Sequence, residues 1–223
     1  MAVVKGRVSV IIPGRTELYF QETIDSALER ATGDVEVIAI VDCDEPPDKP
    51  LGNQADPRVK LIKLDKAIGQ RAAYNLGVRE SSGEYVMKID AHALMSPGYD
   101  EALKAHCPPK TTVLPEMRRL NVHEWRDKPR GKTLFMNFGL DLYCHFWRGY
   151  RKRPEAKVEY PEVMTGQGSC WFTTREWSDY IGLLDEGVGS WGNVGIEVSL
   201  RTWLCGGSPV SYTHLTLPTI LLV

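Results

Sequence analysis

The residues in this sequence best suited to chemistry are Asp90 and His92, which lie two positions apart just after an apolar run. The run, residues 85–89, is predicted to be a strand, and the two-residue spacing lets both side chains point the same way. A carboxylate and an imidazole suit Mn²⁺, which accepts oxygen and nitrogen ligands and leaves positions open for diphosphate oxygens. The alternative is a strand-end Asp that caps the next turn beside a surface His.

A second carboxylate follows another apolar run. Asp42 comes directly after residues 35–41, where it could accept hydrogen bonds from a ribose hydroxyl or a base N–H, although such a residue also commonly caps a loop. We expect Asp42 and Asp90 to follow adjacent parallel strands. Such strands would bring the two acids to one edge of the sheet and into one crevice.

Elements that alternate between strand and helix must position these residues. The apolar run at 8–12 predicts a buried parallel strand, and Pro13-Gly14 predicts the turn after it. Thr16 is expected to cap a helix that keeps one apolar face and stops at Gly33. The other predicted elements are strands at 35–41, 59–64 and 85–89 and a helix at 70–80. This alternation predicts an α/β fold with a doubly wound, mostly parallel sheet.

The second half of the chain is less regular. Aromatic and basic residues mix between Trp125 and Arg153, where we expect the acceptor-facing structure, and a strand at 164–172 and a helix at 195–204 follow. The last stretch, 208–223, continues no earlier pattern and resembles translated adapter-derived tails. We therefore predict one domain at 1–207 and a non-native or disordered tail at 208–223, the alternative being a native frayed tail or edge strand.

Composition and charge restrict the partners of the protein. Its 223 residues suit one domain, and a formal net charge of -2 gives no general field for nucleic acid or an anionic membrane, so we expect no nucleic acid partner. Five scattered cysteines without a C-x-x-C pair favour reduced thiols. We see no signal-peptide pattern, and no apolar run nears about 20 residues. We therefore expect a soluble, cytoplasmic protein without a transmembrane segment.

Several ordered motifs resemble those of family-two glycosyltransferases. They are Val8-Ser-Val-Ile-Ile-Pro13, Ile24-Asp25-Ser26, Val41-Asp42, Gly69 to Gly77 with Asn75, Ser82-Gly83-Glu84-Tyr85 and Asp90-Ala-His92. The D-x-H form is similar to that of the polypeptide N-acetylgalactosaminyltransferases, as are Trp191-Gly192, Glu197, Ser199, Arg201 and Trp203 to Gly207. The resemblance covers about residues 7–207, and the order of the motifs makes it more specific than any one of them. It implies the GT-A fold, a three-layer α/β sandwich.

Carried over position by position, the resemblance implies a site for a nucleotide-sugar donor with a divalent metal, Mn²⁺ or Mg²⁺. Simpler structural roles exist for three of its residues: a helix cap for Asn75, a tight bend at Gly168 and a core position for Trp191. The implied donor-binding residues are Asp42, Asn75, Asp90, Gly168 and Trp191, and the implied metal ligands are Asp90 and His92.

The implied reaction transfers a sugar from a nucleoside-diphosphate sugar, UDP-linked by resemblance, to an acceptor hydroxyl. Its leaving diphosphate gains negative charge, which a divalent cation stabilises. The base of inverting relatives falls at Gly195 and the acid before it at Val194, so that base is missing. Glu197 aligns with the second acid of the motif, which makes it the catalytic candidate and favours a retaining transfer. A salt bridge between Glu197 and Arg201, four positions on, is the structural alternative.

Two rival interpretations remain open. A sugar-phosphate nucleotidyltransferase needs a glycine-rich phosphate loop after its first strand, whereas Pro13-Gly14-Arg15-Thr16 holds one glycine. A non-catalytic nucleotide-sugar or glycan-binding module is favoured by the missing acids at Val194 and Gly195. It is opposed by the presence of Asp90, His92 and Glu197. The His that gives the D-x-H enzymes a third metal ligand would lie beyond Gly207. The acceptor, whether glycan, protein or lipid, is not fixed by the sequence.

Overall fold

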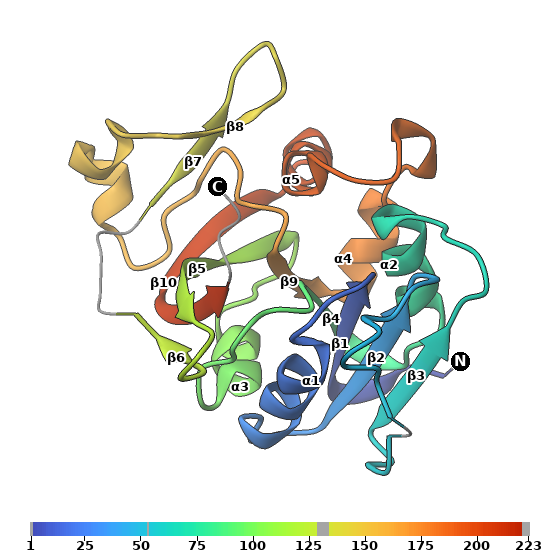
Figure 1. The fold of residues 1–223 in the computed structure, drawn as a ribbon. Coiled ribbons are helices and arrows are strands. Elements are labelled where there is room, and N and C mark those ends of the chain that lie inside the picture. Colours follow the sequence, from blue (N-terminus) through green and yellow to red (C-terminus); the bar gives the residue numbers. More distant parts are fainter. Residues whose placement is uncertain (1, 53, 129–133, 220–223) are drawn as a thin grey trace.

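The computed structural model describes residues 2–52, 54–128 and 134–219, which form a central sheet with helices on both faces (Figure 1). The main sheet has the order β10, β5, β9, β4, β1, β2, β3, with β6 paired to β5, while β7 and β8 form a separate hairpin. The strands are β1 (Val4–Gly14), β2 (Val35–Val41), β3 (Val59–Lys63), β4 (Gly83–Ile89), β5 (Thr111–Asn121), β6 (Arg126–Asp127), β7 (Met136–Phe138), β8 (Cys144–Phe146), β9 (Cys170–Thr174) and β10 (Ser208–Thr219). The helices are α1 (Phe20–Glu29), α2 (Gln70–Arg79), α3 (Tyr99–Ala105), α4 (Arg175–Ile181) and α5 (Val194–Leu204), with 3-10 turns η1 (Tyr150–Lys152), η2 (Pro154–Lys157) and η3 (Glu186–Val188).

The parallel half of the sheet is built around β1. This strand lies between β2 and β4 and is parallel to both, and β3 is parallel to β2. The order β3, β2, β1, β4 therefore reverses at β1, and open α/β sheets bind ligands at such a point. Strand β10 is parallel to β5, whereas β9 is antiparallel to both of its neighbours. The predicted mostly parallel sheet is confirmed.

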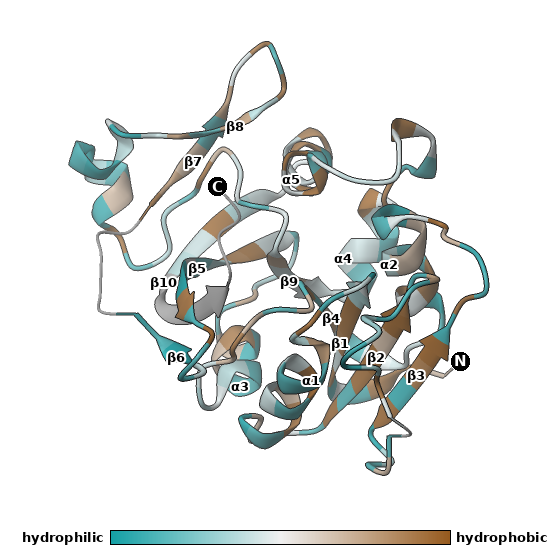
Figure 2. Cartoon of the chain, in the orientation of Figure 1, coloured by the Kyte–Doolittle hydropathy of each residue, from teal (hydrophilic) through white to brown (hydrophobic). Residues whose placement is uncertain are grey.

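Alternate side chains of β1 face two different cores. Val8, Val10 and Ile12 pack in a core shared with α1 and α3, while Ile11 packs in a second core shared with α2 and α4. Because both faces of the strand are covered, its sequence is continuously apolar instead of alternating. Figure 2 shows the same pattern as hydrophobic segments along β1 and β2. The predicted three-layer α/β sandwich is confirmed.

Helix α1 begins later than the sequence predicts. Its first residue is Phe20, whereas Thr16 adopts a left-handed conformation with φ +55° in the turn after β1. The Thr16 N–H donates to Asp44 O at 2.8 Å, which ties this turn to the segment after β2, and Thr16 is not the helix cap. The helix also ends at Glu29, before Gly33, whose N–H donates to Asp100 Oδ2 at 2.6 Å at the start of α3.

The other elements near the sheet edge mostly lie where the sequence predicts them. Strand β2 matches its predicted bounds, and β3, α2, β4 and α5 differ by one or two residues at an end. The prediction of a strand over 164–172 is wrong, because β9 starts only at Cys170 and residues 164–169 are irregular. Backbone groups of this segment bind residues after β4 instead: Ser169 O accepts from the Asp90 N–H at 2.9 Å.

Residues beyond Gly207 continue the fold as strand β10. It pairs with β5 from Ser208 to Thr219, and Val210 and Tyr212 are buried in the core that α1 and α3 share. The structure thus shows the edge strand that the sequence left as the alternative to a disordered tail. A domain end at Gly207 and a non-native origin for 208–223 stay predictions, and residues 220–223 lie outside the described part of the chain.

Two further features concern the cysteines and the character of the helices. All five cysteines are free, and two of them, Cys107 and Cys170, are buried. None of the helices in the described part of the chain combines the length and apolar character that crossing a bilayer would need. The cytoplasmic location stays a prediction.

Candidate donor site

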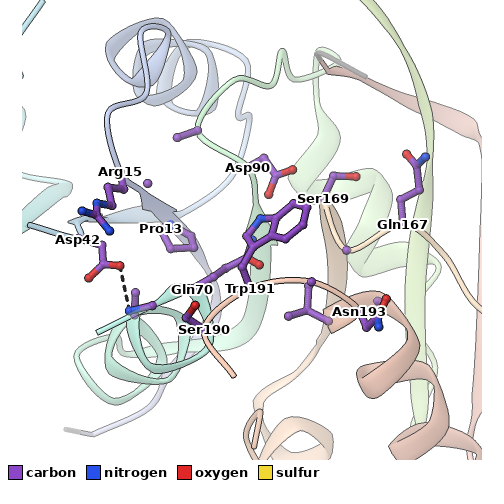
Figure 3. Close-up of a pocket in the computed structure, with 18 of the residues that line it drawn as sticks. Pro13, Arg15, Asp42, Gln70, Asp90, Gln167, Ser169, Ser190, Trp191 and Asn193 are labelled. Carbon is purple, nitrogen blue, oxygen red and sulfur yellow. Dashed lines mark hydrogen bonds between the residues drawn. The ribbon is translucent and has the colours of Figure 1, made fainter. Parts of the chain in front are cut away.

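A cavity of about 720 Å³ lies at the carboxyl ends of β1, β2 and β4, where the strand order reverses (Figure 3). This volume is typical of small-molecule sites. The walls come from segments 13–17, 67–70, 90–92, 166–169 and 190–196, together with Asp42. Of the residues predicted from the sequence, Asp42, Asp90, His92, Gly168 and Trp191 line this cavity, and Asn75 and Glu197 are not among its lining residues.

The two strand-end carboxylates reach the cavity from either side of β1. The prediction that Asp42 and Asp90 follow adjacent strands is wrong, because β1 lies between β2 and β4. All three strands are parallel, so their carboxyl ends still meet at one edge of the sheet. Pro13 and Gly14 of β1 therefore lie between the two acids, and Figure 3 shows Pro13 in that position.

Asp90 and His92 come together at one end of the cavity. The distance from Asp90 Oδ2 to His92 Nε2 is 3.7 Å, and both side chains are partly shielded from solvent. The Asp90 N–H donates to Ser169 O, which fixes the backbone at the end of β4. An oxygen and a nitrogen donor therefore face each other beside open space.

This pair fits two positions in the coordination sphere of a divalent cation. Donors that each lie about 2.1 Å from one ion can be no more than about 4.2 Å apart, and the 3.7 Å separation satisfies this limit. Over the described ranges, no group of three His, Cys, Asp or Glu side chains is placed to hold a metal. Mg²⁺ is commonly held in proteins by one or two carboxylates together with phosphate oxygens and water.

Lys88 is a functional residue that the sequence reasoning missed. Its side chain is fully buried, its ammonium pairs with Asp90 Oδ1, and it donates to Gly168 O at 2.6 Å. The ammonium also lies 5.6 Å from the centre of the Trp171 ring. Lys88 thus holds one oxygen of Asp90 and leaves the other facing His92. A lysine inside an otherwise apolar strand was the signal for this role, since buried lysines are rare unless paired.

His92 has a carboxylate partner on its other side. Its Nδ1 lies 3.0 Å from Oε2 of Glu17, which is also part of the cavity wall. Burial lowers the pKa of His92, but the hydrogen bond with Glu17 and the negative charge of Asp90 outweigh it, so the pKa lies above its ordinary value. The sequence reasoning did not identify Glu17, because it precedes α1 and gives no periodic signal.

Asp42 is buried and joins β2 to the start of α2. Its Oδ1 accepts from the Ile68 N–H at 2.7 Å and its Oδ2 from the Gly69 N–H at 2.9 Å. The dashed line at Asp42 in Figure 3 marks a hydrogen bond of this carboxylate. The carboxylate thus binds the two backbone N–H groups just before α2, near the positive end of the helix dipole, an arrangement that favours negative charge. Asp42 therefore has the loop-capping role, and a nucleoside contact would use its remaining lone pairs.

Asn75 is not among the residues that line the cavity, and its donor-binding role stays a prediction. Its Nδ2 donates to Leu184 O and to Glu186 Oε1, both at 2.8 Å, while its Oδ1 accepts from the Leu184 N–H at 3.0 Å. The side-chain amide thus holds Leu184 and the first residue of η3. Asn75 supports the site only indirectly, through the loop that leads to Trp191.

Glu197 also lies outside the cavity wall, and its catalytic role stays a prediction. Its Oε2 accepts from Arg71 Nε at 2.9 Å, and its Oε1 accepts from the Asp185 N–H at 2.6 Å and from Arg201 Nε at 3.3 Å. The predicted alternative, a pair with Arg201, is present. Glu197 therefore holds Arg71 and the loop that leads to Trp191.

Arg71 is the centre of this loop support. The side chain is only 2% exposed, and besides Glu197 it binds Gly189 O through Nη1 at 2.9 Å and Gly192 O through Nη2 at 2.7 Å. These two carbonyls flank Trp191. A charged group from α2 thus fixes the loop that forms one wall of the cavity.

Gly168 lies where the irregular segment before β9 meets the start of α5. A Cβ at this position would be 2.3 Å from Val194 Cγ2 and 3.0 Å from the Gly195 N. The glycine is therefore required for close packing, which agrees with the tight approach expected there. Its carbonyl is the acceptor for Lys88, so this contact also supports Asp90.

We expect Gly168→Ala to lower the free energy of unfolding by about 1–3 kcal/mol, because the added methyl group must displace Val194 or the α5 backbone. It should also weaken nucleotide binding, since the displaced segment lines the cavity. Denaturant unfolding measures the first effect. Gly149→Ala is the matched control, because a Cβ there meets nothing within 4 Å, and an unfolding midpoint equal for the two variants would contradict the packing role.

Trp191 is exposed, which excludes the core position that the sequence left open. Its side chain is 80% exposed, and Figure 3 shows the ring projecting into the cavity. The neighbouring Ser190 O accepts from the Gln70 N–H at 2.8 Å, and the φ of Gly192 is +92°, so the backbone beside the ring is held in a tight turn. An exposed indole beside the cavity is suited to stacking on a sugar or a base.

We expect Trp191→Ala to raise the KM for a nucleotide-sugar donor about 10-fold, since loss of one stacked ring costs about 1–3 kcal/mol. Because the side chain is exposed, the free energy of unfolding should change by less than about 0.5 kcal/mol. Steady-state kinetics and thermal unfolding check both. Tyr180→Ala removes a comparably exposed ring from α4 as the control, and a KM unchanged by Trp191→Ala would exclude the ring from the donor site.

Comparison with known proteins connects this site to a family. Residues 9–182 match the model of glycosyl transferase family 2. Polypeptide N-acetylgalactosaminyltransferase 5 of Caenorhabditis elegans is 28% identical over 221 residues, which cover 91% of this chain and 35% of that protein. The human polypeptide N-acetylgalactosaminyltransferase 3 is 29% identical over 185 residues, covering 76% of this chain and 29% of that protein. The chain thus spans about a third of the length of these relatives.

Solved structures show the same fold. The structure of GalNAc-T7 with UDP, GalNAc and Mn²⁺ superposes with a TM-score of 0.76 at 18% identity, over 96% of this chain and 43% of that one. The mannosyltransferase PcManGT from Pyrobaculum calidifontis, in complex with GDP-Man and Mn²⁺, gives 0.65 at 16% identity, over 96% of this chain and 56% of that one. The predicted GT-A fold is confirmed. Because the family model matches most of the chain, this protein belongs to glycosyl transferase family 2.

Proposed function

We propose that this chain is the donor-binding and catalytic domain of a metal-dependent glycosyltransferase that transfers a sugar from a UDP-sugar to an acceptor hydroxyl. The observation that carries the proposal is the Asp90 and His92 pair, whose donor atoms face each other at 3.7 Å in a cavity at the strand-order reversal. Two relatives of the same fold were solved with a nucleotide or nucleotide sugar and Mn²⁺, which supports the same ligand class here.

The chain provides groups for each part of a nucleotide sugar. A bound Mn²⁺ or Mg²⁺ would stabilise the charge that develops on the leaving diphosphate. Asp90 and His92 would hold that cation, Asp42 would orient the nucleoside, and Trp191 would cover the sugar. Ser169 Oγ is buried beside the cavity without a hydrogen-bond partner among the described residues, and a bound ligand oxygen would satisfy it.

Retention of the anomeric configuration is the stereochemical outcome that we propose. The cavity residues from 166–169 and 190–196 include no carboxylate, and the positions of the inverting base are Val194 and Gly195. Inversion needs a base beside the acceptor hydroxyl. With Glu197 engaged by Arg71 and Arg201, no acid of α5 is placed for that task.

The acceptor is proposed by analogy with the relatives, whose names specify polypeptides, so a peptide rich in Ser and Thr is the first candidate. Glycans and lipids with free hydroxyls are the other classes.

The test is release of nucleoside diphosphate from UDP-GalNAc, UDP-GlcNAc, UDP-glucose and GDP-mannose, with Mn²⁺ or with chelator, in the presence of each acceptor. We expect Mn²⁺-dependent release of UDP from one UDP-sugar, and NMR of the product should show the anomeric configuration of the donor. Inverted product would contradict retention. UDP binding without turnover on any acceptor would favour the alternative, a non-catalytic nucleotide-sugar-binding module.

A further inference from the structure

The His92 imidazole lies between two carboxylates that approach its two ring nitrogens. Glu17 Oε2 is 3.0 Å from Nδ1, and Asp90 Oδ2 is 3.7 Å from Nε2. The His92 side chain is 12% exposed, whereas Glu17 is 33% exposed at the cavity wall. Because a carboxylate can only accept, the Glu17 contact places a proton on Nδ1. In the neutral imidazole, Nε2 then carries the lone pair that faces Asp90.

This arrangement is the one that orients histidine ligands in metal sites. A histidine that binds a metal through one nitrogen usually donates the other N–H to a carboxylate, which fixes both the tautomer and the ring direction. In this chain the Glu17 carboxylate engages Nδ1, and Nε2 is the ring nitrogen that lies toward Asp90 Oδ2. The two contacts therefore select one ligating atom, Nε2.

The backbone holds Glu17 and His92 in register with each other. Gly14 allows the close approach, because a Cβ there would be 2.9 Å from Ala91 Cβ and 3.1 Å from Glu17 Cγ. Helix α1, which follows Glu17, also binds the segment after His92: Thr23 Oγ1 accepts from the Ala93 N–H at 3.1 Å. The contact between Glu17 and His92 is thus built into the packing of α1 against the end of β4.

We propose that Glu17 is a positioning residue, which fixes the Nε2 of His92 toward the cation site through a hydrogen bond to Nδ1. The proposal rests on the proposed function, since it assigns a role in the same metal site. Glu17 itself does not bind the cation. It acts by accepting the Nδ1–H, so an uncharged acceptor of the same shape should replace it.

Three variants of the full chain test this role. Glu17→Ala removes the acceptor, Glu17→Gln keeps an oxygen acceptor without the charge, and Glu29→Ala removes a carboxylate from an exposed position on α1 as the control. Free Mn²⁺ measured by electron paramagnetic resonance gives the affinity for Mn²⁺ alone and with UDP. Loss of an outer-shell partner typically weakens metal binding about 10- to 100-fold. We expect this loss in Glu17→Ala, less than about 3-fold loss in Glu17→Gln, and none in Glu29→Ala.

A second readout uses no metal. Nitrogen-15 NMR of the neutral histidine rings, recorded above the pKa of His92 and with His92 assigned by comparison with His92→Gln, should show the proton on Nδ1 in the wild type and a mixture of tautomers in Glu17→Ala. Equal Mn²⁺ affinity in the wild type and Glu17→Ala, or equal losses in the Gln and Ala variants, would overturn the positioning role alone. Absence of Mn²⁺ binding by the wild type, with or without UDP, would overturn this role and the proposed function together.

Discussion

Replacing Asp90 by asparagine is expected to lower glycosyl transfer at least about 100-fold and to abolish Mn²⁺-dependent UDP binding, because it removes the charged oxygen donor from the cation site. The same change leaves the ammonium of Lys88 without its counter-charge in a fully buried position. Removal of one partner of a buried ion pair costs about 3–5 kcal/mol, so the variant should also unfold more easily. Titration with UDP and Mn²⁺ and denaturant unfolding measure the two effects.

A double variant separates the two effects. Asp90→Asn with Lys88→Met removes both charges, and an apolar side chain of similar length replaces the buried lysine. We expect the double variant to recover much of the lost stability and none of the Mn²⁺-dependent binding. If the double variant recovers Mn²⁺-dependent UDP binding together with stability, Asp90 serves only to neutralise Lys88. That result would exclude Asp90 as a metal ligand.

Arg71→Met is expected to be the most destabilising single change in the loop support, at about 3–5 kcal/mol. It leaves Glu197 in a largely buried position with Arg201 as its remaining cation, and it leaves the carbonyls of Gly189 and Gly192 without their guanidinium donors. UDP binding should weaken as well, because these carbonyls flank Trp191. Denaturant unfolding measures the stability. Arg79→Met on the same helix is the control, since Arg79 is 58% exposed and should change stability by less than about 1 kcal/mol.

Glu197→Gln distinguishes this structural role from catalysis. If Glu197 only holds Arg71 and the loop, the variant should lose stability while kcat falls less than about 10-fold, because the reacting groups lie elsewhere. A catalytic carboxylate would show the reverse, with kcat reduced by about 10³-fold or more and an unfolding midpoint close to that of the wild type. That second result would restore the role that the family motif implies.

Local sequence patterns predict the parts of the site that depend on strand ends. Asp42 and Asp90 follow apolar runs that are strands in the structure, and parallel pairing brings both to one cavity. The patterns do not predict which strands are neighbours, because strand order is set by crossover connections and not by the strands themselves. This is why β1 was not expected between the two acids.

The contacts that hold the site join residues far apart in the chain, which periodicity cannot show. Arg71 and Glu197 are separated by 126 positions and Glu17 and His92 by 75. Motif position alone assigned Glu197 to catalysis, yet its carboxylate is satisfied by two arginines and a backbone N–H. Lys88 could have been identified from the sequence, since a lysine in a buried strand near an acid needs a partner.

Calorimetric titration of the wild-type chain with UDP tests whether the cavity binds a UDP-sugar through a divalent cation. We expect saturable binding of UDP with Mn²⁺, about 10-fold or more weaker binding with chelator, and loss of the Mn²⁺ dependence in Asp90→Asn. Equal UDP affinity with and without Mn²⁺, or no binding of UDP under either condition, would contradict it.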